Sequence, residues 1–172
     1  ALSMPYHLAL GNHDHRARCL SAFPETQTDP NGFVQFVVES EVGRFIILDT
    51  LAQGQTDGHL CEHRLAWLDK QLAMDAGPVF LLMHHPPFDC GIPLMDDIRL
   101  NNPEALWSII APHRTRIRHL FFGHLHRPVG GSWRGIPIST LWSTNHQVDL
   151  ALIRNPGLQG TLGAPSYGVV LI

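Results

Sequence analysis

Three short motifs carry residues of the kinds that bind metal ions. They are Gly11–Asp14 (Gly-Asn-His-Asp), His84–Pro87 (His-His-Pro-Pro) and Gly123–His126 (Gly-His-Leu-His), and each follows an apolar run. Imidazole is the commonest protein ligand for borderline metals such as Zn²⁺. If the apolar runs are strands of an open α/β sheet, ligands gather beyond their carboxyl ends. The sequence therefore predicts that three strand ends converge on one metal site.

The last motif offers two imidazoles separated by one residue, His124 and His126. The apolar run before it, Ile117 to Phe122, predicts a strand that Gly123 ends. In extended backbone, residues i and i+2 project to the same side, so we expect both rings to face one point. Taken alone, the pair is as typical of a protein surface as of a metal site. The other two motifs favour the metal site.

The rest of the pattern predicts the elements that position these motifs. Strands are expected at 6–10, 33–38, 44–48, 79–83, 117–122, 128–133, 136–141, 148–153 and 167–172. Helices are expected from Asp14, as the capping residue, to Phe23, from Leu60 to Met74 and from Pro103 to Ala111. Two of the strand pairs read as hairpins, and helices alternate with strands between them. We expect an α/β fold in which mixed β-sheets are flanked by helices.

Composition excludes several other classes of protein. The 172 residues are 44% hydrophobic and 16% charged, and the formal net charge is −3 without a basic cluster. These values disfavour disorder and a nucleic-acid polymer as partner, and the apolar runs are shorter than the ~18 residues of a membrane span. The three cysteines are widely spaced and predict neither disulfides nor a cysteine zinc site. We expect a cytoplasmic protein that does not bind membranes.

In order and spacing, the three motifs resemble those of the calcineurin-like metallophosphoesterases. The stretch Ser143–Gln147 (Ser-Thr-Asn-His-Gln) is similar to the branch that cleaves cyclic nucleotides and glycerophosphodiesters. The resemblance covers residues 6–147, and it implies two packed mixed sheets with helices outside. It also implies two divalent ions, Fe, Mn or Zn, bridged by an aspartate and by a hydroxide that attacks phosphorus. The expected activity is hydrolysis of small phosphodiesters.

The resemblance further implies which residues bind the metal ions. One ion would be held by Asn12, His84 and His124, and the other ion would be bound by His126. The plainer alternative for Asn12 is a turn residue, because asparagine tolerates unusual backbone angles. His85 is expected to be a structural neighbour that donates a hydrogen bond to the backbone.

Two catalytic roles and one substrate contact are implied in the same way. His13 would protonate the leaving alkoxide or stabilise charge on the phosphate, and Asp14 would orient it. The alternative for His13 is a buried, hydrogen-bonded histidine. His146 would contact the substrate. Trp133 and Trp142 flank predicted hairpin strands, and stacking on the substrate is the less favoured role for both.

The chain departs from the family pattern at its beginning. Members carry an Asp-x-His motif and a Gly-Asp motif upstream of Gly-Asn-His-Asp, but only ten residues precede Gly11 and none is aspartate. We therefore expect a single domain, residues 1–172, that lacks two N-terminal strand–helix units of roughly 30 residues each. The bridging aspartate and one Asp-x-His pair would be absent with them. Asp49 follows an apolar run, but it comes after Gly11–Asp14 and is a poor replacement.

An incomplete domain has consequences for activity and assembly. We expect this chain alone to hold at most one weakly bound ion, to be impaired in hydrolysis and to form homo-oligomers that cover exposed sheet surface. Two functions from other classes stay open. A non-catalytic scaffold of the same fold is disfavoured because every ligand position in the three motifs is filled. A β-lactamase-like hydrolase would need a clustered His-x-His-x-Asp-His, which the sequence lacks.

Overall fold

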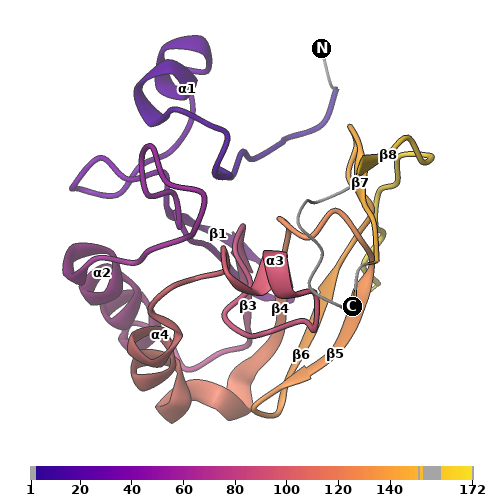
Figure 1. Ribbon diagram of the computed structural model, residues 1–172. Coiled ribbons are helices and arrows are strands. Elements are labelled where there is room, and N and C mark those ends of the chain that lie inside the picture. Colours follow the sequence, from indigo (N-terminus) through magenta and orange to yellow (C-terminus); the bar gives the residue numbers. More distant parts are fainter. Residues whose placement is uncertain (1–2, 151, 153–159, 172) are drawn as a thin grey trace.

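The computed structural model describes residues 3–150, 152 and 160–171, and Figure 1 shows a mixed sheet with helices beside it. Six strands form this sheet in the order β1-β2-β3-β4-β6-β5. Their bounds are Phe36–Ser40 (β1), Gly43–Ile47 (β2), Val79–Met83 (β3), Ile117–Phe122 (β4), Val129–Trp133 (β5) and Ile136–Thr140 (β6). A second, small sheet pairs β7 (Gln147–Val148) with β8 (Gly160–Thr161). The predicted mixed α/β fold is confirmed.

Parallel strands occupy the centre of the large sheet, and an antiparallel hairpin closes each edge. The strands β2, β3, β4 and β6 pair in parallel, whereas β1 and β5 pair antiparallel to their hairpin partners. The carboxyl ends of parallel strands lie at the same edge of a sheet. His84 directly follows β3, and Gly123 and His124 directly follow β4. The topology therefore brings two of the three motifs to one edge.

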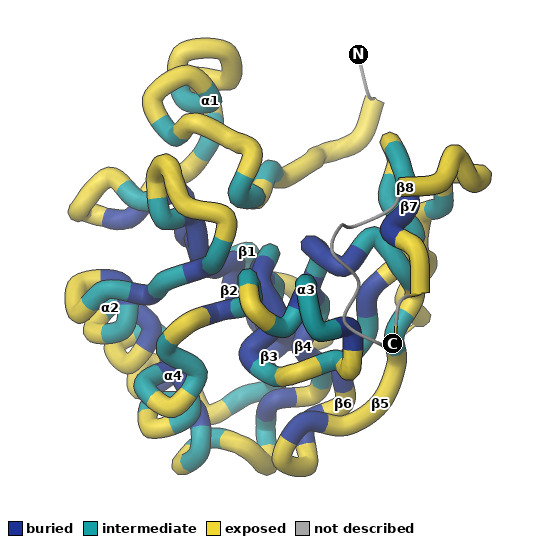
Figure 2. Tube along the Cα trace, in the orientation of Figure 1, coloured by how far each residue is buried: buried dark blue, intermediate teal, exposed yellow. Residues whose placement is uncertain are grey.

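Helices form the second layer of the core. Their bounds are Arg16–Ala22 (α1), Glu62–Ala73 (α2), Pro93–Asp96 (α3) and Pro103–Ile110 (α4), followed by the 3₁₀ helix Ala111–Arg116 (η1). Leu68 of α2 and Leu106 of α4 are buried in one cluster with Ile46, Leu81 and Leu120 of the central strands. Each such side chain stabilises the fold by about 1.5–3 kcal/mol. Figure 2 shows the buried residues concentrated on the sheet, which makes the strand ends a rigid platform.

Among the described residues, no helix combines the length and the hydropathy needed to cross a membrane. The short elements α3 and η1 were not predicted. Both begin at or next to a proline, Pro93 in α3 and Pro112 in η1. Proline is tolerated in the first turn of a helix, where its absent N–H would have no partner. Helices of four to six residues are too short to show a recognisable periodic spacing of hydrophobic residues.

The chain before the sheet differs from the prediction in two respects. Residues 6–10 form no strand, because no described strand pairs with their backbone groups. Asp14 is not the cap of α1: the N-cap is His15, which makes no side-chain capping bond. The Asp14 carboxylate instead accepts a hydrogen bond from the amide of Gly11 at 2.8 Å. The helix α1 has no fully buried residue, and its Cys19 and Leu20 pack against the apolar cluster that includes Phe36 and Ile47 of the sheet.

Side-chain hydrogen bonds also delay the first strand, which begins at Phe36 and not at residue 33. The Asp29 carboxylate accepts from the amides of Asn31 and Phe33, both at 2.9 Å. Local bonds of this kind compete with a sheet ladder for the same amides. The second hairpin forms as predicted, with Arg134 and Gly135 at positive φ (51° and 88°), as a two-residue turn requires.

The last two predicted strands are wrong over the residues that the structure describes. The strand expected at 148–153 ends at Val148, since 149, 150 and 152 have no strand structure and 151 and 153 lie outside the described residues. Residues 167–171 are likewise not in a strand, and 172 is outside the described part. Both segments have the composition of strands, but a strand forms only where a partner edge accepts its backbone hydrogen bonds.

Candidate metal centre

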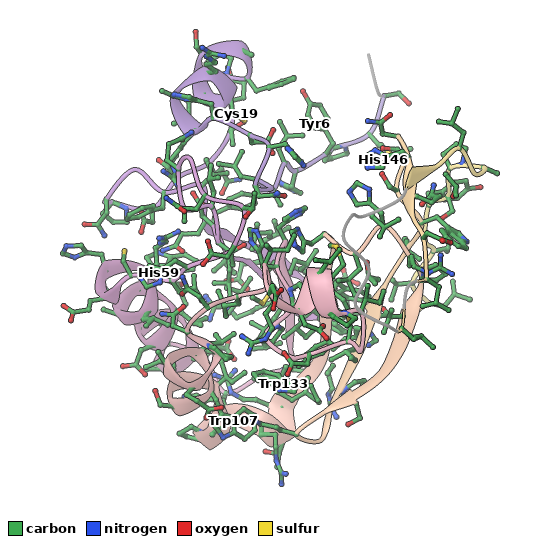
Figure 3. All side chains as sticks on the ribbon, in the orientation of Figure 1. Tyr6, Cys19, His59, Trp107, Trp133 and His146 are labelled. Atoms are coloured by element: carbon green, nitrogen blue, oxygen red, sulfur yellow. The ribbon has the colours of Figure 1, made fainter. Side chains whose placement is uncertain are left out.

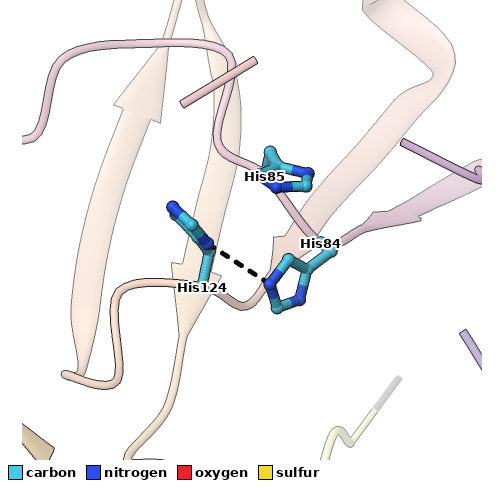
Figure 4. Close-up of side chains that lie close together, drawn as sticks. All are labelled: His84, His85 and His124. Atoms are coloured by element: carbon cyan, nitrogen blue, oxygen red, sulfur yellow. Dashed lines mark hydrogen bonds between the residues drawn. The ribbon is translucent and has the colours of Figure 1, made fainter. Parts of the chain in front are cut away.

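Three side chains from the three motifs meet at the carboxyl edge of the sheet. The Nε2 atom of His84 lies 3.0 Å from Oδ1 of Asn12 and 3.3 Å from Nδ1 of His124. Figure 4 shows the two imidazoles facing each other across this contact. Atoms that share one ion at about 2.1 Å lie roughly 3.0–3.4 Å apart for octahedral or tetrahedral angles. The distances from His84 to Asn12 and from His84 to His124 both fit ligands that share a single ion.

Both histidines of this group are neutral at physiological pH. Burial, followed by the charges of neighbouring histidines, lowers the pKa of His84 to about 2 and that of His124 to about 3. A neutral imidazole offers a nitrogen lone pair to a metal, whereas an imidazolium does not. The donor set of two imidazoles and one amide oxygen suits Fe, Mn or Zn.

Two motif glycines provide the space that the His84 ring occupies. A Cβ atom at Gly11 would lie 2.8 Å from Cε1 of His84, and one at Gly123 would lie 3.1 Å from its Nδ1. The amide of Gly123 also donates to the carbonyl of His84 at 3.0 Å, which ties two motifs together. We did not predict these glycines as site residues. The available signal was that two of the three motifs begin with glycine.

His85 belongs to the same cluster, but its two ring nitrogens are engaged elsewhere. One ring nitrogen from each of His84, His85 and His124 lies within 4.8 Å of the others. His85 Nε2 donates to the carbonyl of Thr56 at 3.3 Å, so its Nδ1 accepts from the Thr50 hydroxyl at 2.8 Å. His85 is completely buried, and burial lowers its pKa to about 4. The prediction that His85 donates to the backbone is confirmed.

His126 pairs with His146 beside this cluster. The two rings have centroids 4.5 Å apart, and Nδ1 of His126 donates to the main-chain carbonyl of His146 at 2.9 Å. Because a carbonyl only accepts, the proton is on Nδ1 and the lone pair is on Nε2, as a metal ligand requires. Burial and the charge of His146 lower the pKa of His126. Figure 3 places His146 at the β7 side of the molecule.

The geometric reason for grouping His124 with His126 is wrong. The backbone after β4 is not extended, because φ is 68° at His124 and 51° at His126. The amide of Leu125 donates to the carbonyl of Gly123 at 2.7 Å and closes a tight turn. This turn sends the His124 ring to His84 and the His126 ring to His146. Left-handed non-glycine residues are uncommon and cluster at functional sites.

His13 is exposed and lies within electrostatic range of the cluster. Its charge contributes to lowering the pKa values of His84, His124 and His126. Among the described residues, no hydrogen bond joins Asp14 to His13, because the Asp14 carboxylate binds the Gly11 amide. That bond, with the 3.1 Å bond from the Asp14 amide to the Gly11 carbonyl, closes the motif into a turn. Asp14 thus shapes the turn and does not contact the ring.

The sequence model of the calcineurin-like phosphoesterase family matches residues 1–128. This chain belongs to the calcineurin-like phosphoesterase family. Membership confirms the resemblance seen in the three motifs and excludes the β-lactamase-like alternative.

The curated relatives of this calcineurin-like phosphoesterase carry phosphodiesterase names. The chain is 43% identical to a "Probable cyclic nucleotide phosphodiesterase" of Rhodopseudomonas palustris, with 99% of this chain and 64% of the relative covered. It is 33% identical to a "Probable glycerophosphodiester phosphodiesterase GpdQ" of Arcobacter nitrofigilis, with 96% and 61% covered. It is 30% identical to a "cAMP/cGMP dual specificity phosphodiesterase" of Mycobacterium tuberculosis, with 94% and 50% covered. The chain thus spans 50–64% of the length of these relatives.

A solved structure supports the fold of this family member. The crystal structure of a dimetal phosphatase from Danio rerio superposes with a TM-score of 0.64 at 20% identity, over 79% of this chain and 60% of that protein. At this identity the likeness concerns the fold.

Asp49 is not free to replace the bridging aspartate of the family. It is completely buried, and Arg16 contacts its two carboxylate oxygens at 2.7 and 3.0 Å. The amides of Val34 and Leu51 donate to the same carboxylate at 2.9 and 3.0 Å. Arg64 lies 3.8 Å away and adds a second positive charge. The role of Asp49 is therefore structural.

Replacing Asp49 with alanine is expected to destabilise the fold by roughly 3–5 kcal/mol, because Arg16 and Arg64 would lose their partner. The free energy of unfolding in urea measures this loss. Asp69→Ala, at an exposed position of α2, is the matched control and should change stability by less than about 0.5 kcal/mol. Equal stability of the two variants would contradict the assignment.

The tryptophans divide between core and surface. Trp133 is buried, and its ring centroid lies 5.5 Å from that of Trp107, so the alternative of substrate stacking by Trp133 is wrong. Figure 3 shows this pair at the opposite end of the molecule from His146. Trp142 is half-buried, and the guanidinium of Arg127 lies 5.1 Å from its ring centroid.

Proposed function

We propose that this chain supplies one ion's ligands and the substrate-facing histidines of a metal-dependent phosphodiesterase. The substrates would be small phosphodiesters, namely 3′,5′-cyclic nucleotides or glycerophosphodiesters. The observation that carries the proposal is the convergence of Asn12, His84 and His124 on one point, with both imidazoles neutral. The names of the relatives, which cover both kinds of diester, support the substrate class.

In this proposal Asn12, His84 and His124 hold one divalent ion, and His126 belongs to a second ion. When bound, such ions lower the pKa of a coordinated water towards ~7 and stabilise negative charge on phosphate oxygens. Phosphodiesters hydrolyse very slowly without help, so a centre that supplies both effects is the expected catalyst. The identity of the native metal among Fe, Mn and Zn stays a prediction, as does the organisation of residues 1–172 as one domain.

The remaining site residues would act on the substrate. The exposed His13, within electrostatic range of the ligands, would give a proton to the leaving alkoxide as a general acid. Asp14 would hold the turn that carries His13. His146, whose ring meets the His126 ring edge to face, would contact the phosphodiester. Homo-oligomerisation and the exclusion of nucleic-acid polymers as substrates stay predictions.

The test is hydrolysis by the full-length gene product loaded with Mn²⁺, using bis(p-nitrophenyl) phosphate, cyclic AMP and glycerophosphoethanolamine as substrates. We expect turnover of all three, with a higher kcat/KM for the natural small diesters than for single-stranded DNA or a phosphopeptide. Folded, metal-loaded protein that hydrolyses none of them would support the scaffold alternative. A preference for DNA or phosphopeptide would contradict the substrate class.

A further inference from the structure

The segment that carries His146 is tied to the metal motif by side chains. His126 donates to the carbonyl of His146, and the next residue, Arg127, donates from Nη1 to the carbonyl of Val148 at 2.9 Å. Carbonyls of residues i and i+2 in a strand point the same way. His146 immediately precedes β7 and Val148 ends it, so the two side chains tie this short strand, which also pairs with β8, to the metal motif.

Arg127 contacts both ends of the loop formed by Ser143–Gln147. Its Nη1 atom bonds to Val148, the residue just after the loop. The Cζ atom of the same guanidinium lies over the ring of Trp142, the residue just before the loop, at 5.1 Å from the ring centroid. A cation over an indole face is attracted by the negative charge of the ring face, and more strongly when the pair is desolvated. A single side chain therefore joins the entry and the exit of the loop.

The loop is also closed from within. The buried Gln147 accepts from the Ser143 amide through Oε1 and donates to the Ser143 carbonyl through Nε2, both at 2.9 Å. Asn145 donates from its amide to the Ser143 hydroxyl at 3.1 Å. These hydrogen bonds hold the loop in one conformation. Besides the pairing of β7 with β8, the hydrogen bonds from His126 and Arg127 tie the loop to the metal motif.

We propose that Arg127 is a positioning residue that sets the place of His146 against His126 and thereby the affinity for the phosphodiester. The inference rests on the proposed function, because it assigns a role to His146 in substrate binding. Arg127 itself makes its described contacts to Trp142 and Val148 and none to the three clustered histidines. Its effect is therefore on the loop and not on the ligand group of Asn12, His84 and His124.

The first experiment is independent of activity. Hydrogen exchange of the amides in 142–148 is compared between the wild type, Arg127→Ala and Arg118→Ala, an exposed arginine of β4 that serves as control. We expect exchange in this segment to rise at least tenfold in Arg127→Ala only, with unchanged exchange in β3 and β4. A loop that stays as protected as in the wild type would overturn the inference, whether or not the protein hydrolyses diesters.

The second experiment uses the full-length, Mn²⁺-loaded protein and a double-mutant cycle with cyclic AMP as substrate. We expect Arg127→Ala to raise KM about tenfold with kcat and metal content nearly unchanged. In a His146→Ala background the same substitution should have little further effect on KM, because the side chain being positioned is already gone. Additive effects of the two substitutions, or a loss of kcat without a change in KM, would overturn the proposal.

A conservative variant guards against misfolding of Arg127→Ala. Arg127→Lys keeps a donor for the Val148 carbonyl and gives up the planar contact with Trp142. We expect it to recover most of the loop protection and of the affinity. Loop exchange in Arg127→Lys that equals that of a fully open segment would contradict the assignment of the Val148 bond. If the wild type itself shows no turnover, the proposed function fails and the exchange experiment still decides the role of Arg127.

Discussion

Replacing His84 with alanine is expected to lower kcat/KM of the full-length protein for a small diester by more than 100-fold. Loss of a residue that hydrogen-bonds to a metal ligand already costs roughly 10–100-fold, and His84 lies at the centre of the ligand group itself. Its Nε2 atom faces Asn12 at 3.0 Å and His124 at 3.3 Å. Without it the remaining two ligands do not define an ion position.

Metal content is the second readout of this variant. Elemental analysis should show the loss of one ion per chain in His84→Ala, in protein whose urea unfolding remains cooperative. His63→Ala is the control, because His63 is an exposed histidine on α2. It should retain full metal content and activity. Normal metal content in His84→Ala would mean that the group of Asn12, His84 and His124 is not the metal centre.

Replacing His13 with alanine is expected to lower kcat by roughly 10²–10⁴-fold for substrates whose leaving group is an alkoxide. An alkoxide must be protonated as it departs, and His13 is the exposed imidazole that lies within electrostatic range of the ligand histidines. With bis(p-nitrophenyl) phosphate the leaving phenolate is weakly basic and needs little protonation. The same variant should therefore be far less impaired on that substrate.

The contrast between the two substrates separates acid catalysis from a structural effect. His15→Ala is the matched control, since His15 is also exposed and follows the motif without a side-chain capping bond. It should leave both rates unchanged. An equal loss on both substrates in His13→Ala would assign His13 to charge stabilisation of the phosphate. Full activity on cyclic AMP would remove His13 from the mechanism.

The local pattern of apolar residues was sufficient to predict the strands that lead into the metal-binding motifs. The strands β3 and β4 have the predicted bounds, because short, mostly apolar runs between breakers are typical of buried parallel strands. Parallel strands present their carboxyl ends at one edge, so the meeting of His84 with His124 also followed from sequence. The family assignment rested on the same motifs, read in order.

Other features were decided by the tertiary structure alone. The direction of the His126 ring depends on the positive φ angles of His124 and His126. The apolar run before these residues does not predict such backbone angles. The Asp14 carboxylate accepts a hydrogen bond from a backbone amide and none from His13. The Asp49 carboxylate forms an ion pair with Arg16, which lies 33 residues away in the sequence. The segment 6–10 has a strand-like composition but finds no partner edge among the described residues.

The sequence by itself determined which residue types follow the strands. These residue types indicated metal-ion chemistry and identified the family of this protein. Tertiary structure decided which of them share a ligand point and what holds them there. Asn12 meets His84 across 72 positions of the chain, and Arg127 reaches Val148 across 21. Local periodicity reports only on neighbours within a few residues, whereas these contacts depend on how hydrogen-bond donors and acceptors meet after the sheet has formed.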